Sequence, residues 1–325
     1  MGGYIIIELT FLGTASAIHT KNRNHSSIVV KVSDKTVLLD CGESTQKQLM
    51  YANISPMKID IIFITHLHGD HILGLPGLLQ SIAFRGRTEP LHIYGPRGID
   101  DLIYHIRQLG YSLIGNNIIT HTISEDGIVY EDDHFMVEAK QMKHTVIDYA
   151  YKIEEKRKPK FIKSKALELG IPEGPLFGNL QRGESIELNG KIINASQVLG
   201  PPRKGIKMVF SGDTIPQESM IEFSKDADLL IHEATFANES KDKADEYGHS
   251  VAEDAALIAK EANVEQLVLT HLSNRYTNSD ELTQEAKKYF ENVVYADDFM
   301  TVIIENKKPV KIINANEKQT KQQEK

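Results

Sequence analysis

The stretch FITHLHGDHILG, residues 63–74, places four side chains that can bind metal ions within six positions. They are His66, His68, Asp70 and His71, and a run of apolar residues comes directly before them. Imidazole and carboxylate groups are common ligands of zinc and related divalent ions. The alternative is a polar loop at the end of a buried strand, but such a loop does not require so many ligands. The stretch therefore predicts a metal site at a strand end.

The spacing of these residues suggests two ions side by side. Side chains two apart in an extended strand end point the same way, so His66 and His68 can bind one ion together. Gly69 lets the backbone turn tightly, which leaves Asp70 and His71 to face a neighbouring position. Two ions need more than four ligands, and further candidates follow other apolar runs: His144, Asp213 and His271. Each alone could be an ordinary loop residue, but together they could converge on one edge of the sheets.

Short apolar runs separated by turn-forming residues supply the strands that would position these ligands. We expect strands at 4–12, 26–32, 35–40, 58–65, 135–142, 206–211, 228–231 and 266–270. Helical spacing of apolar residues predicts helices at 44–53, 72–83, 99–109, 250–262 and 279–289. Two sets of strands with helices between and around them favour a four-layer α/β fold, in which helices cover two packed sheets.

Length, charge and cysteine content limit the class of protein. A chain of 325 residues with 41% hydrophobic content can bury a substantial core. Its net charge of −8 gives no general affinity for nucleic acids, so any such role needs a local basic patch. The single cysteine, Cys41, excludes an internal disulfide, is interpreted as a small core residue, and fits a reducing cytosol. The N-terminal apolar run is too short to span a membrane, so we expect a cytoplasmic protein without membrane association.

One segment differs in composition from the rest of the chain. Residues 152–165 hold seven lysines or arginines in fourteen positions, and helix-breaking residues follow, including Gly174 and Pro175. We predict an insertion at 153–202 that projects as a flexible arm from a main domain at 1–310, although a solvated charged loop is the alternative. Residues 311–325 are expected to form a disordered polar tail.

The motif HLHGDH resembles the signature of the metallo-β-lactamase superfamily. Within it, the chain is similar to the ribonuclease Z family of tRNA 3′-processing endonucleases, through LTFLGTASAI, LLDCGESTQ, FITHLHGDHILGLPGLL, YGPRGI, VFSGDT, IHEATF, GHS and LTHLSNRY. These motifs span nearly the whole chain except the tail. The resemblance implies an αββα sandwich and an enzyme that cuts the 3′ trailer from precursor tRNA next to the discriminator nucleotide, leaving a 3′-hydroxyl.

The resemblance also implies roles for the metal-binding residues. One ion would be held by His66, His68 and His144, a second by Asp70, His71 and His271, and Asp213 would bridge them. Two zinc ions per subunit are expected, and manganese would also suit these ligands. Asp70 could in addition orient the attacking water. Asp40 resembles the family's carboxylate that orients a ligand histidine, although an ordinary turn residue is the alternative.

A proton donor for the leaving group is the next requirement. The family places a glutamate and a histidine opposite the metals, which here are Glu233 and His249. Independently, SVAE predicts a capping box with Ser250 as N-cap and the glutamate three residues later, so His249 would precede a helix N-terminus that favours an anion. A solvent-facing loop histidine is the alternative. His232 is interpreted as structural.

The insertion and one loop are the candidates for binding RNA. In the family a flexible arm with a Gly-Pro step clasps the tRNA, often across a homodimer, and here that step is Gly174–Pro175. The family's Pro-x-Lys-x-Arg-Asn loop corresponds to HTKNRN, with matches at Lys21, Arg23 and Asn24.

Two positions depart from the family pattern. His19 stands where the loop usually has proline, which alters the expected rigidity of the loop. In SNRY, Arg275 is retained as a predicted substrate contact, but Asn274 replaces a small residue.

Two other functions are compatible with these residues. The same metal site could hydrolyse a small phosphodiester or another small ester, in which case the insertion would be dispensable. A non-catalytic RNA-binding metalloprotein is the other possibility, and binding without turnover would establish it. Fold similarity alone would not choose among them.

Overall fold

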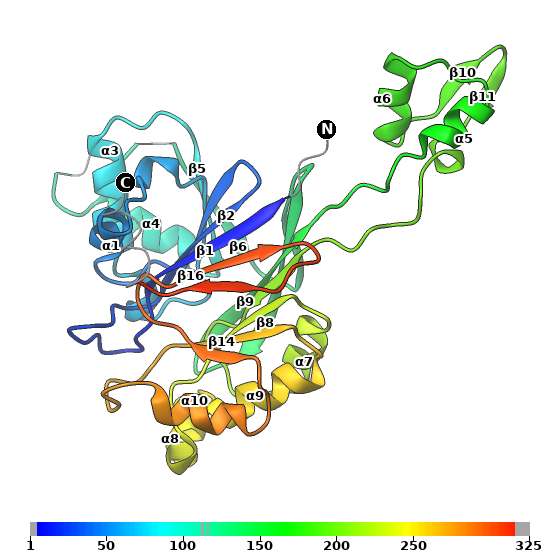
Figure 1. The fold of residues 1–325 in the computed structure, drawn as a ribbon. Coiled ribbons are helices and arrows are strands. Elements are labelled where there is room, and N and C mark those ends of the chain that lie inside the picture. The colour runs from blue at the N-terminus through cyan, green and yellow to red at the C-terminus, as the bar shows by residue number, and fades with distance from the viewer. Residues whose placement is uncertain (1–4, 112–113, 116, 316–325) are drawn as a thin grey trace, which may run out of the picture. The chain divides into compact units, whose positions relative to one another are not determined.

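The computed structural model describes residues 5–315 except 112, 113 and 116. The chain divides into two compact units, a larger one formed by 1–154 with 206–325, and a smaller one formed by 155–205. The larger unit contains two sheets with helices on their outer faces (Figure 1).

The first sheet has eight strands and brings the two ends of the larger unit together. Its order is β17 (Lys311–Ile313), β16 (Thr301–Glu305), β1 (Ile6–Gly13), β2 (Ser27–Val32), β3 (Lys35–Leu39), β4 (Ile61–Phe63), β5 (Leu91–Pro96) and β6 (Ile118–Ile123). The strands β3 to β6 run parallel, whereas β1 pairs antiparallel with both β2 and β16.

The second sheet has seven strands. Its order is β15 (Val293–Tyr295), β14 (Gln266–Thr270), β13 (Leu229–Glu233), β12 (Lys207–Phe210), β9 (Ile147–Glu155), β8 (Phe135–Lys143) and β7 (Gly127–Glu131). The strands β12 to β15 run parallel. Each sheet therefore has a parallel part whose carboxyl ends can carry functional groups at one edge.

Both faces of the central strands are buried, which explains their nearly continuous apolar runs. In β4, Ile61 and Phe63 belong to the core between the sheets, while Ile62 packs against the helices outside. In β14, Val268 points into the inter-sheet core and Leu267 and Leu269 point outward. This two-residue alternation builds three apolar layers and therefore the four-layer sandwich expected from the sequence.

Helices cover the outer face of each sheet (Figure 1). The first sheet is covered by α1 (Thr45–Tyr51), α3 (Leu75–Phe84) and α4 (Ile99–Arg107), and the second by α7 (Glu218–Ser224), α9 (Ala252–Glu261) and α10 (Asp280–Lys287). The remaining helical segments of the larger unit are η1 (Pro56–Lys58), α2 (Gly69–Ile72), η3 (Asn238–Ser240) and α8 (Lys241–Tyr247). Within the described residues no helix is both long and apolar enough to span a membrane.

Several element boundaries differ from the sequence predictions. The predicted helix at 72–83 is divided, because Pro76 fits only the first turn of α3 and α2 ends before it. The predicted strand at 58–65 is reduced to β4, since η1 occupies its start. The predicted tail at 311–325 begins with β17, which pairs with β16, and its residues 316–325 lie outside the described part, as does Tyr4 of the first predicted strand.

The smaller unit has a core of its own. It contains α5 (Lys163–Glu168), α6 (Pro175–Gln181), η2 (Ala195–Gln197) and a hairpin of β10 (Ile186–Leu188) with β11 (Lys191–Ile193). Ala166, Leu180 and Val198 are fully buried in it. The unit begins two residues later than the predicted insertion, because Ile153 and Glu154 still pair with β12.

Candidate metal centre

The parallel strands of both sheets end at the predicted metal ligands. Asp40 follows β3 and His66 follows shortly after β4, while Asp213 follows β12 and His271 follows β14. Glu233 is the last residue of β13. These side chains come from distant parts of the sequence but lie close together in space. His71 and His271, for example, are 200 positions apart, yet their Nε2 atoms lie 3.3 Å from each other.

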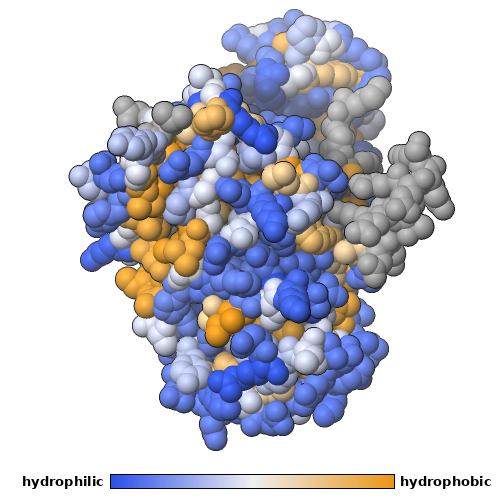
Figure 2. All heavy atoms as spheres, turned by 90° about the vertical axis from the view of Figure 1, so that its left-hand side faces the viewer, coloured by the Kyte–Doolittle hydropathy of each residue, from blue (hydrophilic) through white to orange (hydrophobic). Residues whose placement is uncertain are grey.

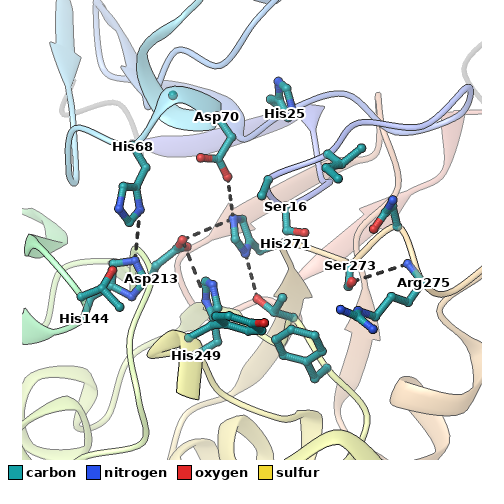
Figure 3. A pocket seen from close by; sticks show the side chains of 18 of the residues that line it. Ser16, His25, His68, Asp70, His144, Asp213, His249, His271, Ser273 and Arg275 are labelled. Carbon is teal, nitrogen blue, oxygen red and sulfur yellow. Dashed lines mark hydrogen bonds and ion pairs between the residues drawn. The ribbon is translucent and has the colours of Figure 1, made fainter. Parts of the chain in front are cut away.

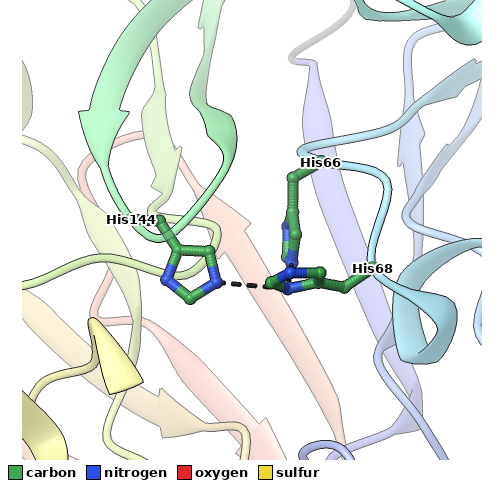
Figure 4. A group of neighbouring side chains, drawn as sticks. All are labelled: His66, His68 and His144. Atoms are coloured by element: carbon green, nitrogen blue, oxygen red, sulfur yellow. Dashed lines mark hydrogen bonds between the residues drawn. The ribbon is translucent and has the colours of Figure 1, made fainter. Parts of the chain in front are cut away.

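The first group consists of three histidines (Figure 4). His66 Nε2 lies 3.0 Å from His68 Nδ1, and that nitrogen lies 3.2 Å from His144 Nε2. Burial first and neighbouring histidines second lower the pKa of His66 to about 3 and that of His68 to about 4. Both imidazoles are therefore neutral near neutral pH, which is the form that binds metal ions.

The second group consists of Asp70, His71, Asp213 and His271. Figure 3 shows Asp70, Asp213 and His271 of this group. Asp213 Oδ2 lies 3.4 Å from His71 Nε2 and 3.3 Å from His271 Nε2, and Asp70 Oδ2 lies 3.3 Å from His271 Nε2. The same Asp213 oxygen lies 3.7 Å from Nε2 of His66 in the first group. Asp213 is therefore within reach of both groups.

Opposite charges dominate the second group. Burial lowers the pKa of His71, but Asp213 and Asp70 outweigh it and raise that pKa well above its ordinary value. Burial likewise raises the pKa of Asp213, and His271 and His71 outweigh it, so the carboxyl stays ionised. His71 must lose a proton before Nε2 can bind a metal ion, so metal binding at this group releases protons.

Four of the histidines are oriented by a partner on Nδ1. His71 Nδ1 donates to Asp40 Oδ2 at 2.8 Å, His66 Nδ1 to Asp148 Oδ2 at 2.7 Å, and His144 Nδ1 to the carbonyl of Gly248 at 2.8 Å. His271 Nδ1 lies 2.8 Å from Thr235 Oγ1, which itself donates to Glu233. Each contact fixes the ring so that Nε2 faces the other ligands. The contact of Asp40 with a ligand histidine agrees with the sequence prediction.

Asp148 is a residue that the sequence reasoning missed. It is fully buried at the start of β9, it contacts His66, and its Oδ2 accepts from Asp213 N at 3.2 Å. Gly212 has a φ of +63° and a Cβ there would lie 2.4 Å from Asp148 Oδ1, so only glycine fits beside it. One acidic residue inside a β-branched and aromatic run was the available signal.

Replacing Asp148 with asparagine is expected to weaken zinc binding by about 10- to 100-fold, because His66 loses the carboxylate that orients it. Competition with a chelator of known affinity measures the change. Asp126→Asn is a matched control, because that carboxylate is exposed and, among the described residues, bonds only Lys140 and Gln141. Equal zinc affinity of Asp148→Asn and the unaltered chain would contradict the orienting role.

The buried Glu233 and the partly buried His249 form a pair next to the second group. His249 Nδ1 lies 2.9 Å from Glu233 Oε1, and backbone amides of Thr214, Ser250 and Thr235 donate to the same carboxylate at 3.1 Å. Burial lowers the pKa of His249, but Glu233 outweighs it and raises that pKa to about 9. His249 is therefore protonated near neutral pH and can donate a proton from Nε2.

In the metal-free protein, Glu233→Gln is expected to lower the pKa of His249 from about 9 towards or below its ordinary 6.5. The reason is that burial still opposes the charged ring while the main stabilising charge is gone. Imidazole ¹⁵N chemical shifts followed against pH measure this value. A pKa that stays near 9 in the variant would show that Glu233 is not the cause.

The predicted capping box does not form, and α9 begins one residue later than predicted. Val251, not Ser250, is the N-cap residue of α9, and the carboxylate of Asp254 accepts from Val251 N at 3.2 Å. Ser250 Oγ instead donates to the carbonyl of Thr214 at 2.7 Å, and its backbone N–H is bound to Glu233. Ser250 therefore holds the strand ends together, which leaves His249 two residues before the cap.

A pocket of about 640 Å³ opens onto both groups. His68, Asp70, His144, Asp213, His249 and His271 line it, together with Ile18, Leu73, Phe236, Tyr247, Asn274 and Arg275. Figure 3 shows these polar side chains turned towards one cavity. The predicted contact Arg275 therefore lies at the pocket, with its side chain exposed.

The other predicted substrate contacts lie elsewhere. Lys21 is exposed, and neither it nor Arg23 nor Asn24 lines the pocket. Arg23 is instead bound to the carbonyl of Ala296, to Thr14 Oγ1 and to the carboxylate of Asp297. Asn24 Nδ2 donates to the carbonyl of Glu43 at 2.6 Å. These two side chains hold the loop in place, which sequence matching cannot distinguish from substrate binding.

The remaining predicted contact, the step Gly174–Pro175, starts α6 in the smaller unit. Gly174 has a φ of +153°, and Pro175 occupies the first turn. The step is therefore a helix start, as the preference of proline for the first turn predicts.

Arg23→Ala is expected to lower the free energy of unfolding by roughly 1.5–3 kcal/mol, the range for a hydrogen-bonded charge. The arginine side chain is only 10% exposed, and its partners Thr14 and Ala296 are buried, so these two lose contacts that water does not replace. Urea unfolding followed by circular dichroism measures the change. Lys21→Ala on the same loop is the control and should change the free energy of unfolding by less than about 0.5 kcal/mol. Equal changes in the two variants would argue against the anchoring role of Arg23.

Known proteins resemble this chain over most of its length. It is 49% identical over 297 residues to the ribonuclease Z of Methanothermobacter thermautotrophicus, which covers 91% of this chain and 96% of the relative. It is 44% identical over 303 residues to the ribonuclease Z of Bacillus subtilis, with 91% and 98% covered. A family model described as anti-Pycsar protein Apyc1 matches residues 7–148.

Solved structures agree with the fold. The crystal structure of the short form of human tRNase Z aligns with a TM-score of 0.66 at 29% identity and covers 90% of this chain and 98% of that one. The metallo-β-lactamase fold protein YhfI from Bacillus subtilis aligns with a TM-score of 0.66 at 23% identity, covering 92% and 100%. With this fold, these relatives and the clustered histidines and aspartates, the chain belongs to the ribonuclease Z family of metallo-β-lactamase-fold enzymes, the tRNA 3′-processing endonucleases.

Proposed function

We propose that this enzyme removes the 3′ trailer of precursor tRNA by hydrolysis next to the discriminator nucleotide and leaves a 3′-hydroxyl on the tRNA. One observation carries the proposal beyond family membership. Residues of both ligand groups and His249, whose pKa is raised to about 9, line the same pocket, which supports an electrophilic centre and a proton donor acting at one substrate position.

The donors fit two zinc ions per chain, and manganese would also suit them. The first group offers three imidazoles, and the second offers two imidazoles and Asp70, with Asp213 placed to serve both. When bound, such an ion pair supplies a water of lowered pKa and charge stabilisation on the phosphate oxygens.

The chain's own residues would then perform the proton transfers. Asp70 lines the pocket and is ionised, since His71 and His271 outweigh its burial and hold its pKa below the ordinary value, so it can orient the attacking water. As water attacks phosphorus, the bond to the tRNA 3′ oxygen breaks. His249 donates its proton to that oxygen, and Glu233 stabilises the charged ring beforehand.

The smaller unit is our candidate for binding tRNA. Its first part exposes Lys158, Lys160 and Lys165, within a protein of net charge −8. Such lysines suit contacts to phosphates and to the shape of an RNA rather than to base sequence. Its affinity for tRNA should therefore fall with increasing salt concentration.

We further propose that the enzyme acts as a homodimer in the cytoplasm. Large apolar side chains are exposed on and near the helices over the first sheet, including Met50, Leu73, Phe84 and Leu109. Figure 2 views this side of the molecule, where hydrophobic residues gather among hydrophilic ones. A second copy could cover them, and sedimentation measures whether it does. The cytoplasmic location stays a prediction from the single cysteine.

The test is cleavage of a 3′-extended precursor tRNA by the zinc-loaded enzyme, compared with hydrolysis of bis(p-nitrophenyl) phosphate. The matched variant lacks 155–205 and joins its ends by a short Asn-Gly turn, which is feasible because Glu154 and Lys207 are paired on neighbouring antiparallel strands. We expect one cut beside the discriminator nucleotide, lost in the variant while the small diester is still hydrolysed. Hydrolysis of the diester alone by the intact enzyme would instead favour a small substrate, and tRNA binding without turnover a non-catalytic role.

A further inference from the structure

A third group of potential ligands lies outside the two groups already described. It consists of His19, His25 and Glu43, and one ligand atom from each lies within 4.8 Å of the others. His19 and His25 come from the loop between β1 and β2, and their rings meet edge to face with centroids 5.0 Å apart. Glu43 comes from the loop between β3 and α1. The group therefore joins two loops that are separate in the sequence.

His25 is buried, and its ring nitrogens lack well-formed hydrogen bonds within the described part of the chain. The residue is only 5% exposed, and neither ring nitrogen has a partner at good hydrogen-bond geometry among the described residues, although burial, which lowers the pKa of the ring, is partly opposed by the nearby Ala17 backbone. Buried polar groups of native proteins are nearly always bonded, and an imidazole has two nitrogens to satisfy. The residue also packs closely on Gly42, where a Cβ would lie 2.5 Å from that of His25. The ring is thus held in place, and its nitrogens remain able to bind a metal ion.

The loops that carry the group are anchored independently of it. Thr20 N donates to the carbonyl of Arg23 at 2.8 Å, and Arg23 is bound to Ala296 and Asp297. Asn24 Nδ2 donates to the carbonyl of Glu43, which ties the second loop to the first. The backbones are therefore preorganised, while the exposed side chains of His19 and Glu43 can adjust around a ligand.

We infer that His19, His25 and Glu43 bind a further divalent transition-metal ion, with zinc as the expected ion. Two histidines and one glutamate form a ligand set that zinc takes in proteins, with a fourth position left for water or another ligand. His25 lines the same pocket as Asp70, so the ion would lie at the rim of the catalytic pocket (Figure 3).

Zinc stoichiometry tests the site. The enzyme and a His19→Ala, Glu43→Gln double variant are dialysed against the same micromolar free zinc, and metal per chain is measured by elemental analysis. Both altered side chains are exposed, so the variant should fold. We expect about one zinc fewer per chain in the variant, whatever number the catalytic groups hold. His134→Ala, another exposed histidine, is the control and should match the unaltered enzyme.

A second readout distinguishes a specific site from loose surface binding. With ¹¹³Cd²⁺ in place of zinc, the enzyme should give one NMR signal that is absent in Glu43→Gln alone and in His25→Gln. Equal zinc content in the enzyme and the double variant would overturn the inference. So would a set of cadmium signals that the single variants leave unchanged.

Discussion

His249→Asn is expected to lower kcat for cleavage of a 3′-extended precursor tRNA by about 10²- to 10⁴-fold, the usual range for loss of a positioned general acid. The reason is that His249 is the protonated group at the pocket whose charge is held by a buried carboxylate, 2.9 Å away. Asparagine keeps a polar side chain of similar reach but cannot donate a proton to the departing oxygen. Single-turnover cleavage rates, measured with saturating enzyme, give the effect on the chemical step.

The chemistry of the leaving group provides the control for this prediction. A diester with a p-nitrophenolate leaving group needs little protonation, so His249→Asn should impair its hydrolysis far less than tRNA cleavage. Zinc content should stay that of the unaltered enzyme, because His249 belongs to neither ligand group in our assignment. Equal losses on both substrates, with unchanged zinc, would mean that His249 acts on the phosphate and not on the leaving group.

Asp213→Ala is expected to abolish tRNA cleavage and to empty both metal positions under conditions in which the unaltered enzyme keeps them filled. Its Oδ2 lies 3.7 Å from His66 Nε2 and 3.3 Å from His271 Nε2, so one carboxylate serves ligands of both groups. Without it, two sets of imidazoles lose their shared negative charge. The loss of metal affinity should exceed the roughly 10- to 100-fold loss expected when a ligand loses its hydrogen-bonding partner.

Metal analysis after dialysis against a weak chelator measures this effect, with far-UV circular dichroism as the check on folding. His68→Ala is the comparison. Because His68 belongs to the first group alone, its replacement should remove mainly one of the two ions. If Asp213→Ala kept as much zinc as the unaltered enzyme, the bridging role would be wrong.

The sequence was most informative where residue spacing and strand geometry impose the same arrangement. His66 to His71 follow β4 in the first sheet, whereas Asp213 and His271 follow β12 and β14 in the second. These strands belong to the parallel part of each sheet, and the carboxyl ends of both parts carry the ligands. The two-sheet architecture followed from the same apolar runs. Both predictions rest on the spacing of apolar residues and on the order of the elements along the chain, and a single sequence contains both.

Other features depend on packing that a single sequence does not display. In the sequence, Asp148 is one acidic residue in an apolar run, and only the structure shows that β9 brings it into contact with His66. Arg23 matched a family motif, but its role as a loop anchor depends on Ala296 and Asp297, more than 270 positions away. The strands β6 and β7 carry partly exposed, irregular patterns, since they lie at sheet edges, and were not predicted. Long-range contacts of this kind override local patterns.

The pairing of β1 with β16 has a consequence for how the enzyme is made. β1 ends at residue 13 and β16 begins at residue 301, so one edge of the first strand synthesised waits for one of the last. At about 5–20 residues per second on the ribosome, that wait is roughly 15–60 s. During this time the nascent chain carries an open, apolar strand edge that can pair with neighbouring chains on the same message. Its yield in the cell should therefore depend on chaperones that occupy this edge until translation ends.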